Sequence, residues 1–135
     1  MRIAVGSDED TAVLAAVVGY LEGAGHAVDV VARGAAWPDV GRQVGELVAS
    51  GRADIGVVCC WTGTGVSIAA NKVKGVRAAL CGDAPTADGA RRWNDANVVA
   101  LSLRATSEAV AAEILDAFLS GVPDPDESAN IAGLE

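Results

Sequence analysis

The stretch Asp54–Lys72 reads DIGVVCCWTGTGVSIAANK and carries the strongest structural signal in the chain. Its first part, Asp54–Cys60, is almost continuously apolar, which is typical of a strand covered on both faces. A turn with two glycines follows, and Gly63–Lys72 is predicted to run through this turn into a helix. A buried strand that leads directly into a helix favours a parallel α/β arrangement.

The rest of the chain repeats this alternation. Four further strands are predicted, at Arg2–Ser7, Ala27–Val31, Val76–Cys81 and Asn97–Leu101. Four further helices are predicted, at Thr11–Gly25, Trp37 to near Gly51, Pro85–Arg92 and Thr106–Leu119. The expected fold is therefore α/β, a Rossmann-like three-layer sandwich with a five-stranded parallel sheet and helices on both faces.

Length and composition fit one globular domain. The chain has 135 residues, of which 51% are hydrophobic, and we expect a single domain over residues 1–120 with an acidic C-terminal tail over residues 121–135. The net charge is −8 and no run of Lys and Arg forms a basic stripe, so nucleic acid is not an expected partner. No signal peptide and no apolar run of membrane-spanning length is evident, so we expect a cytoplasmic protein without membrane contact.

Cysteine and histidine usage gives no sign of a metal site. Cys59, Cys60 and Cys81 lack zinc-ligand spacing, and the single histidine, His26, lies far from them in the sequence. All three cysteines also suit the role of reduced, buried, small apolar side chains. A thiol or redox role for the adjacent pair stays open as a minor alternative.

The segment that follows Cys60 has the composition of a ligand loop. In parallel sheets, ligands bind outside the carboxyl ends of the strands, where this segment is expected to lie. Two glycines allow close approach of the backbone, the helix start directs free N–H groups at an anion, and a helix N-terminus favours a thiolate. The loop is not a nucleotide P-loop, because no GK[ST] follows, and a purely structural glycine turn remains an alternative.

Three further places could contribute polar groups to such a site. Asp8 ends the first strand, although a helix N-cap is an alternative role for it. The segment Arg91–Asn97 is either a turn or a set of polar side chains lining a pocket. Arg104 follows the fifth strand and is either a ligand group or a solvated surface arginine.

Together these motifs resemble the family of ribose-5-phosphate isomerase B and galactose-6-phosphate isomerase. The resemblance rests on GSD at Gly6–Asp8, CxTGxGxSIAANK at Cys60–Lys72, GxRAALC at Gly75–Cys81 and RxxNDANV at Arg91–Val98. It covers about residues 1–120. It implies an aldose–ketose isomerase that works through a cis-enediolate, without metal or organic cofactor.

The resemblance also implies residue roles. Cys60 matches the base of the cysteine-using branch and Thr62 the threonine that assists it, whereas Val66 stands where the other branch has a glutamate. Backbone amides of the loop would hold the oxyanion. The implied substrate-binding residues are Asp8, Gly63, Thr64, Gly65, Ser67, Asn94 and Arg104. Trp61 and Trp93, where this chain departs from the family, are further candidate substrate-binding residues. The partner implied is a sugar or sugar phosphate, in a homodimer or dimer of dimers with a shared active site.

Several positions depart from the family pattern. Glu9 and Trp93 stand where histidines are usual, the second of which helps to open the sugar ring, and Trp61 replaces a glycine. The C-terminal segment has no basic residue where the family usually carries a phosphate-binding cluster. We therefore expect an altered substrate, open-chain or non-phosphorylated, with Trp61 and Trp93 as an apolar wall. The alternative is a non-catalytic sugar-binding homologue or a subunit of a hetero-oligomeric isomerase.

Overall fold

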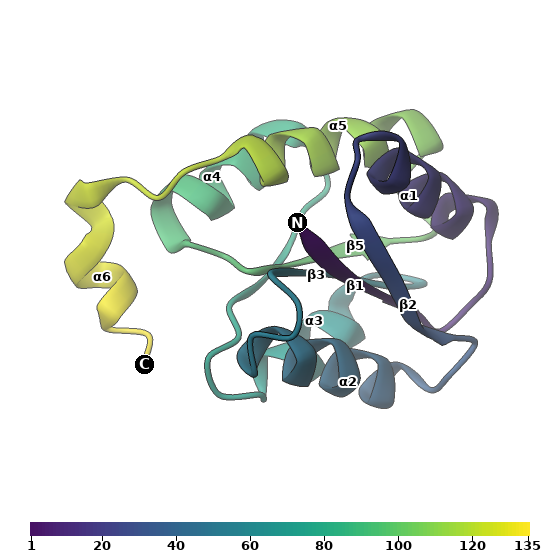
Figure 1. Cartoon of the computed structure of the whole chain (residues 1–135), viewed down its shortest axis with the longest axis horizontal. Coiled ribbons are helices and arrows are strands. Elements are labelled where there is room, and N and C mark those ends of the chain that lie inside the picture. The colour runs from purple at the N-terminus through teal and green to yellow at the C-terminus, as the bar shows by residue number, and fades with distance from the viewer.

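A computed structural model describes all 135 residues and contains one five-stranded parallel sheet. The strand order is β2-β1-β3-β5-β4, which places β3 at the centre (Figure 1). The strands are β1 (Arg2–Ser7), β2 (Ala27–Arg33), β3 (Ile55–Cys60), β4 (Ala78–Leu80) and β5 (Val98–Ser102). From β1 the chain winds to β2 on one side and to β3 on the other, so the switch point of the sheet lies between β1 and β3.

Helices cover both faces of the sheet. Helices α1, α4 and α5 form one layer, and α2 and α3 form the other (Figure 1). The bounds are α1 (Ala12–Gly23), α2 (Trp37–Ala49), α3 (Thr64–Asn71), α4 (Ala84–Asn94) and α5 (Glu108–Ser120). This confirms the predicted three-layer α/β fold. None of the helices is long and apolar enough to cross a membrane.

The core consists of two apolar clusters, one on each face of the sheet. All six residues of β3 are buried, which explains its unbroken apolar sequence. Successive side chains of a strand point to opposite faces. Cys59 accordingly packs in the cluster beneath α1 and α5, whereas Cys60 packs in the cluster beneath α2 and α3.

Strand β4 is shorter than the predicted Val76–Cys81. The side chain of Asn97 accepts a hydrogen bond from the amide of Arg77 at 2.7 Å and donates one to the carbonyl of Gly75 at 2.9 Å. On the open edge, Asn71 bonds both the amide and the carbonyl of Ala78. At the beginning of the strand, side-chain amides thus pair alongside the backbone bonds from Asn97 and Val98 to the carbonyl of Arg77.

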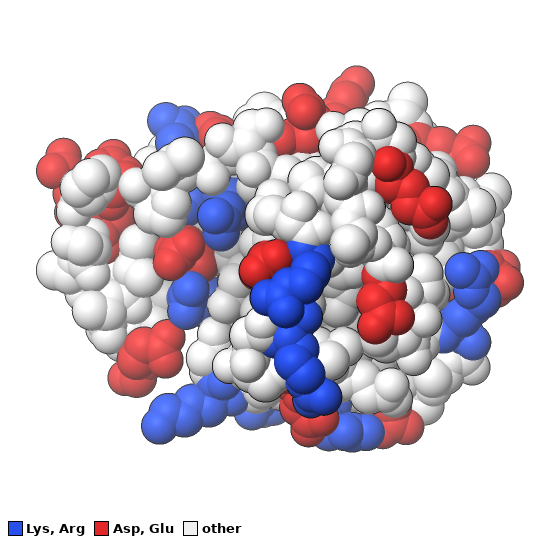
Figure 2. All heavy atoms as spheres, in the orientation of Figure 1, with Lys and Arg blue, Asp and Glu red and all other residues white.

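The C-terminal segment contains structure that the sequence pattern did not predict. A 3-10 turn, η1 (Pro125–Glu127), leads into the short helix α6 (Ser128–Ala132), which stands beside α4 (Figure 1). Glu135 forms an ion pair with Arg77 at 3.1 Å. On the face shown in Figure 2, several Lys and Arg side chains lie close to Asp and Glu side chains.

Candidate active site

The glycine loop lies directly beyond the carboxyl end of β3. Gly63 adopts a left-handed conformation (φ +78°) and is the N-cap of α3, where no side chain caps the helix. The first amides of α3 are therefore left for another acceptor, as is usual for a helix start that binds an anion. The hydroxyls of Thr62 and Thr64 are 2.7 Å apart, and Ser67 is bonded back to Gly63 through its amide.

The loop is anchored on the segment that follows β5. The carbonyl of Cys60 accepts a hydrogen bond from the amide of Leu103, and the carbonyl of Trp61 accepts bonds from the amide of Arg104 and the hydroxyl of Ser102. These bonds, of 2.9 to 3.0 Å, bring Arg104 to the loop. The predicted proximity of these two segments is therefore present within a single chain.

Asp8 lies beside the end of β3 and has an unpartnered oxygen. Its amide donates to the carbonyl of Cys59 at 3.2 Å, whereas its Oδ1 is buried without a hydrogen-bond partner. Burial, followed by the neighbouring Glu9, raises the pKa of Asp8 above its usual value. The N-cap of α1 is Thr11, so the alternative role of Asp8 as a helix cap is wrong. A buried acceptor that no protein group satisfies is free to bind a ligand hydroxyl.

Cys60 occupies the last position of β3 and is 5% exposed in the single chain. Its surroundings are apolar and include Val40 and Val66. The other two thiols are held neutral, because burial raises the pKa of Cys59 to about 12 and that of Cys81 to about 11. Of the three cysteines, only Cys60 ends the strand that leads into the glycine loop and α3.

Arg104 reaches a hollow at this edge of the sheet. The hollow measures about 530 Å³ and is also lined by Thr62, Leu80, Cys81 and Ser102. The guanidinium of Arg104 is exposed, and no carboxylate lies within ion-pair distance of it. Unpaired charge of this kind suits an anionic ligand. Sequence reasoning gave neither Ser102 nor Leu80 a role in binding, although Leu80 lies in the GxRAALC motif and Ser102 starts the segment after the predicted fifth strand.

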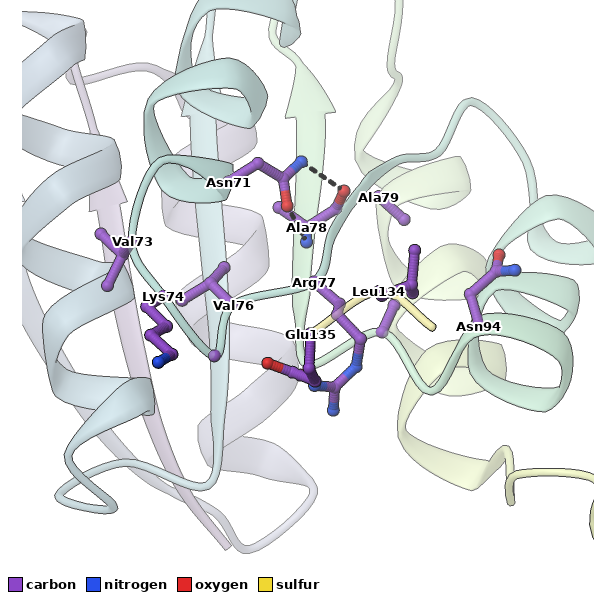
Figure 3. A pocket seen from close by; sticks show the side chains of 12 residues that line it. Asn71, Val73, Lys74, Val76, Arg77, Ala78, Ala79, Asn94, Leu134 and Glu135 are labelled. Atoms are coloured by element: carbon purple, nitrogen blue, oxygen red, sulfur yellow. Dashed lines mark hydrogen bonds and ion pairs between the residues drawn. The ribbon is translucent and has the colours of Figure 1, made fainter. Parts of the chain in front are cut away.

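Trp93 and Asn94 lie elsewhere in the single chain. Helix α4 starts beyond the carboxyl end of β4 and returns to the opposite edge, so Asn94 is about 15 Å along the helix from that edge. There Asn94 lines a hollow of about 500 Å³ together with Arg77 and Glu135 (Figure 3). Trp93 packs on Gly89 and lines a groove with Leu80 and Pro85. One chain therefore does not bring Asn94 to Cys60.

Two tryptophans near the loop differ in their contacts. Trp61, predicted as part of an apolar wall, is 55% exposed. Trp37, which the sequence indicated only as the start of a helix, lies with its ring against Gly65. The glycine at position 65 indicated that another group packs closely against the loop, but the sequence did not identify that group as Trp37.

The loop has neither an imidazole nor a metal-binding group of side chains. His26 lies 3.1 Å from the amine of Met1 through its Nδ1, at the amino edge of the sheet. No three His, Cys, Asp or Glu side chains gather where they could hold a metal ion. Proton transfer at the loop would thus fall to thiol, hydroxyl and carboxyl groups.

Comparison with known proteins gives a family match over almost the whole chain. The sequence pattern of the Ribose/Galactose Isomerase family matches residues 3–131. Galactose-6-phosphate isomerase subunit LacB of Clostridium acetobutylicum is 46% identical over 89 residues, 66% of this chain and 51% of that protein. D-erythrulose-4-phosphate isomerase of Pectobacterium atrosepticum is 34% identical over 125 residues, 88% of this chain and 82% of that protein. The alignment thus spans only about half the length of LacB.

Solved structures agree with this match. Type B ribose 5-phosphate isomerase of Trypanosoma cruzi superposes with a TM-score of 0.93 at 35% identity, covering 99% of this chain and 95% of that one. The same enzyme of Clostridium thermocellum gives a TM-score of 0.92 at 34% identity, with 99% and 95% coverage. The similarity therefore extends to the C-terminal segment as well as the sheet.

Proposed function

Because the chain belongs to the ribose/galactose isomerase family, we propose that it is an aldose–ketose isomerase in which Cys60 carries the proton. The observation that carries this proposal is the left-handed turn at Gly63, which starts α3, uncapped by any side chain, just beyond Cys60. The proposed base, Cys60, and the unbonded amides at the start of α3 are then close together. That pairing is what formation of an enediolate requires.

The reaction needs no external electron donor or acceptor. The Cys60 thiolate takes the proton from the hydroxyl-bearing carbon next to the carbonyl, and the C–H electron pair forms the C=C bond of the enediolate. The former carbonyl oxygen becomes an oxyanion, which the first amides of α3 stabilise. The thiol returns the proton to the neighbouring carbon while a second proton passes between the two oxygens. Thr62, two residues after Cys60, would assist this transfer through its hydroxyl.

The substrate we propose is a short sugar phosphate that stays open-chain. Trp93 replaces the ring-opening histidine, so a substrate without a ring suits this chain best. A four-carbon sugar phosphorylated on its terminal oxygen has no hydroxyl left to close a five-membered ring. The similarity to D-erythrulose-4-phosphate isomerase supports this class. Asp8 would accept a sugar hydroxyl, and Arg104 would bind the phosphate.

We also propose that two copies of the chain complete the site. Ile68, Leu80 and Trp93 are exposed apolar residues near the open edge of β4. A two-fold axis at this edge, perpendicular to the strands, would make the paired sheets antiparallel, so the carboxyl edge of one copy would lie beside the amino edge of the other. Asn94 of the partner subunit would then approach Cys60.

The burial of Cys60 favours one alternative. A thiol that is 5% exposed has little room for substrate, and the similar LacB is described as a subunit. The chain would then be a sugar-binding subunit that needs an unlike partner for turnover. Full activity of the purified chain alone would exclude this alternative.

The experiment that tests the proposed function is proton exchange in deuterated solvent, followed by NMR. Erythrulose 4-phosphate, ribose 5-phosphate and unphosphorylated tetroses are compared as substrates. We expect exchange next to the carbonyl, fastest for the tetrose phosphate, and a loss of about 10²- to 10⁴-fold in Cys60→Ala and Cys60→Ser.

Cys59→Ala is the matched control, because Cys59 packs in the cluster on the other face of the sheet. It removes a neighbouring thiol without touching the loop, so exchange should persist. Retained turnover in both Cys60 variants would exclude Cys60 as the base. Faster turnover of ribose 5-phosphate than of the tetrose phosphate would exclude the proposed substrate class.

A further inference from the structure

Helices α2 and α3 meet along a seam in which every fourth residue is in close contact. A Cβ added to Gly41 would lie 2.6 Å from the Cβ of Ala69, and one added to Gly45 would lie 3.0 Å from Val73. Residues four apart lie on the same side of a helix, one above the other. Along the seam the backbone of α2 therefore packs directly against α3, which fixes the position of one helix relative to the other.

Trp37 is the end of this seam at the glycine loop. It lies four residues before Gly41, just as Gly65 lies four residues before Ala69. A Cβ added to Gly65 would lie 2.8 Å from Cε3 and 2.9 Å from Cδ2 of Trp37. The benzene part of the indole thus lies directly on the backbone of the first turn of α3.

Packing against Trp37 is the reason that the structure gives for a glycine at position 65. Gly63, in contrast, has a positive φ and would need glycine whatever its neighbours. Gly65 has no positive φ, and the nearest atoms to its added Cβ all belong to Trp37. The identity of Gly65 and the size of Trp37 are therefore coupled.

We propose that Trp37 is a positioning residue that sets the direction of the α3 amides through its contact with Gly65. This inference rests on the proposed function, in which those amides hold the enediolate. Pro38 fits the first turn of α2, and the seam makes that helix a rigid support for the indole. A smaller side chain leaves the first turn of α3 unsupported on this side.

The test uses Trp37→Ala, Trp37→Phe, Gly65→Ala and the double variant Trp37→Ala/Gly65→Ala. We expect Trp37→Ala to lower kcat up to about 100-fold, the usual consequence of a displaced catalytic group, with KM changed less. Trp37→Phe should restore most of kcat. The double variant should be more active than Gly65→Ala alone, because the removed ring makes room for the added Cβ.

Unchanged kcat in Trp37→Ala, an effect on KM alone, or a double variant no better than Gly65→Ala would each overturn the inference. Hydrogen exchange of the Ser67 amide, which is bonded to the carbonyl of Gly63 in the first turn of α3, keeps the inference separate from the proposed function. Should the wild-type chain convert no sugar, that function fails, while faster exchange of this amide in Trp37→Ala, without faster exchange elsewhere in the chain, still supports the positioning role. Unaltered exchange rules it out, and urea unfolding identifies any variant whose exchange reflects global instability.

Discussion

Burial holds two of the three cysteines in their neutral form. Burial raises the pKa of Cys59 to about 12 and that of Cys81 to about 11, so both stay neutral thiols near pH 8. A thiolate is the reactive form of cysteine. Because Cys60 is the proposed base, iodoacetamide at pH 8 should label it first, as measured by mass spectrometry of tryptic peptides.

Labelling of the other two thiols should begin only as the pH approaches their raised pKa values. Cys60→Ser should abolish the early labelling while leaving the late labelling in place. Early modification of Cys59 or Cys81 would contradict the assignment of Cys60 as the reactive thiol. A hydroxamate that mimics the enediolate should slow the labelling of Cys60 if substrate binds beside it.

At the scale of elements, the glycine turn before α3 is more constrained than other glycine turns in the chain. Gly51 and Gly63 have the same backbone conformation (φ +77° and +78°), but only Gly63 is crowded. A Cβ there would lie 2.9 Å from the carbonyl carbon of Leu101, whereas one at Gly51 meets nothing within 4 Å. Gly51→Ala is thus a matched control for backbone strain.

We expect Gly51→Ala to lower the free energy of unfolding by about 1–2 kcal/mol, the cost of a left-handed alanine. Gly63→Ala should lose roughly 1–3 kcal/mol more, because its Cβ overlaps backbone that cannot move aside easily. Urea unfolding of both variants measures the difference. Equal losses would show that the contact with β5 contributes nothing.

The elements that the sequence predicted are those whose signal is local. The unbroken apolar run of β3 and the glycines before α3 identified both elements. The predicted start of β4 at Val76 was wrong. The side chain of Asn97, about 20 positions away, accepts a hydrogen bond from the amide of Arg77 in this segment, and no sequence pattern connects the two residues. Helix α6 was missed for a similar reason, since it has only five residues and its support comes from α4.

The site residues, too, could be predicted only where they lie close together in the sequence. Cys60, Thr62 and the glycines share one loop, and the hydrogen bonds from Arg104 and Ser102 bring the next loop to it. Asn94 carries an equally clear motif but ends a helix at the opposite edge of the sheet. A motif identifies a residue type in a sequence, whereas its place depends on the direction of the helix that carries it.

At the scale of the whole molecule, the separation of Cys60 from Asn94 ties the proposed chemistry to the proposed pairing of two copies. Each proposed site takes Cys60 from one copy and Asn94 from the other. Cys60→Ala and Asn94→Ala chains with different tags, expressed together and purified through both tags, should give a dimer with one intact site. Its activity should be about half that of wild type, since one of the two equivalent sites survives.

The matched control pairs a wild-type chain with a chain that carries both substitutions. Each site then lacks either the thiol or the amide, so this dimer should be as inactive as the single-variant homodimers. A site contained within one chain gives the opposite pattern: the first dimer is inactive and the second keeps about half of the activity. Because both dimers contain the same four residues at positions 60 and 94, only their distribution between the chains differs. The steady-state rates of the two dimers therefore decide whether catalysis takes place within a copy or between copies.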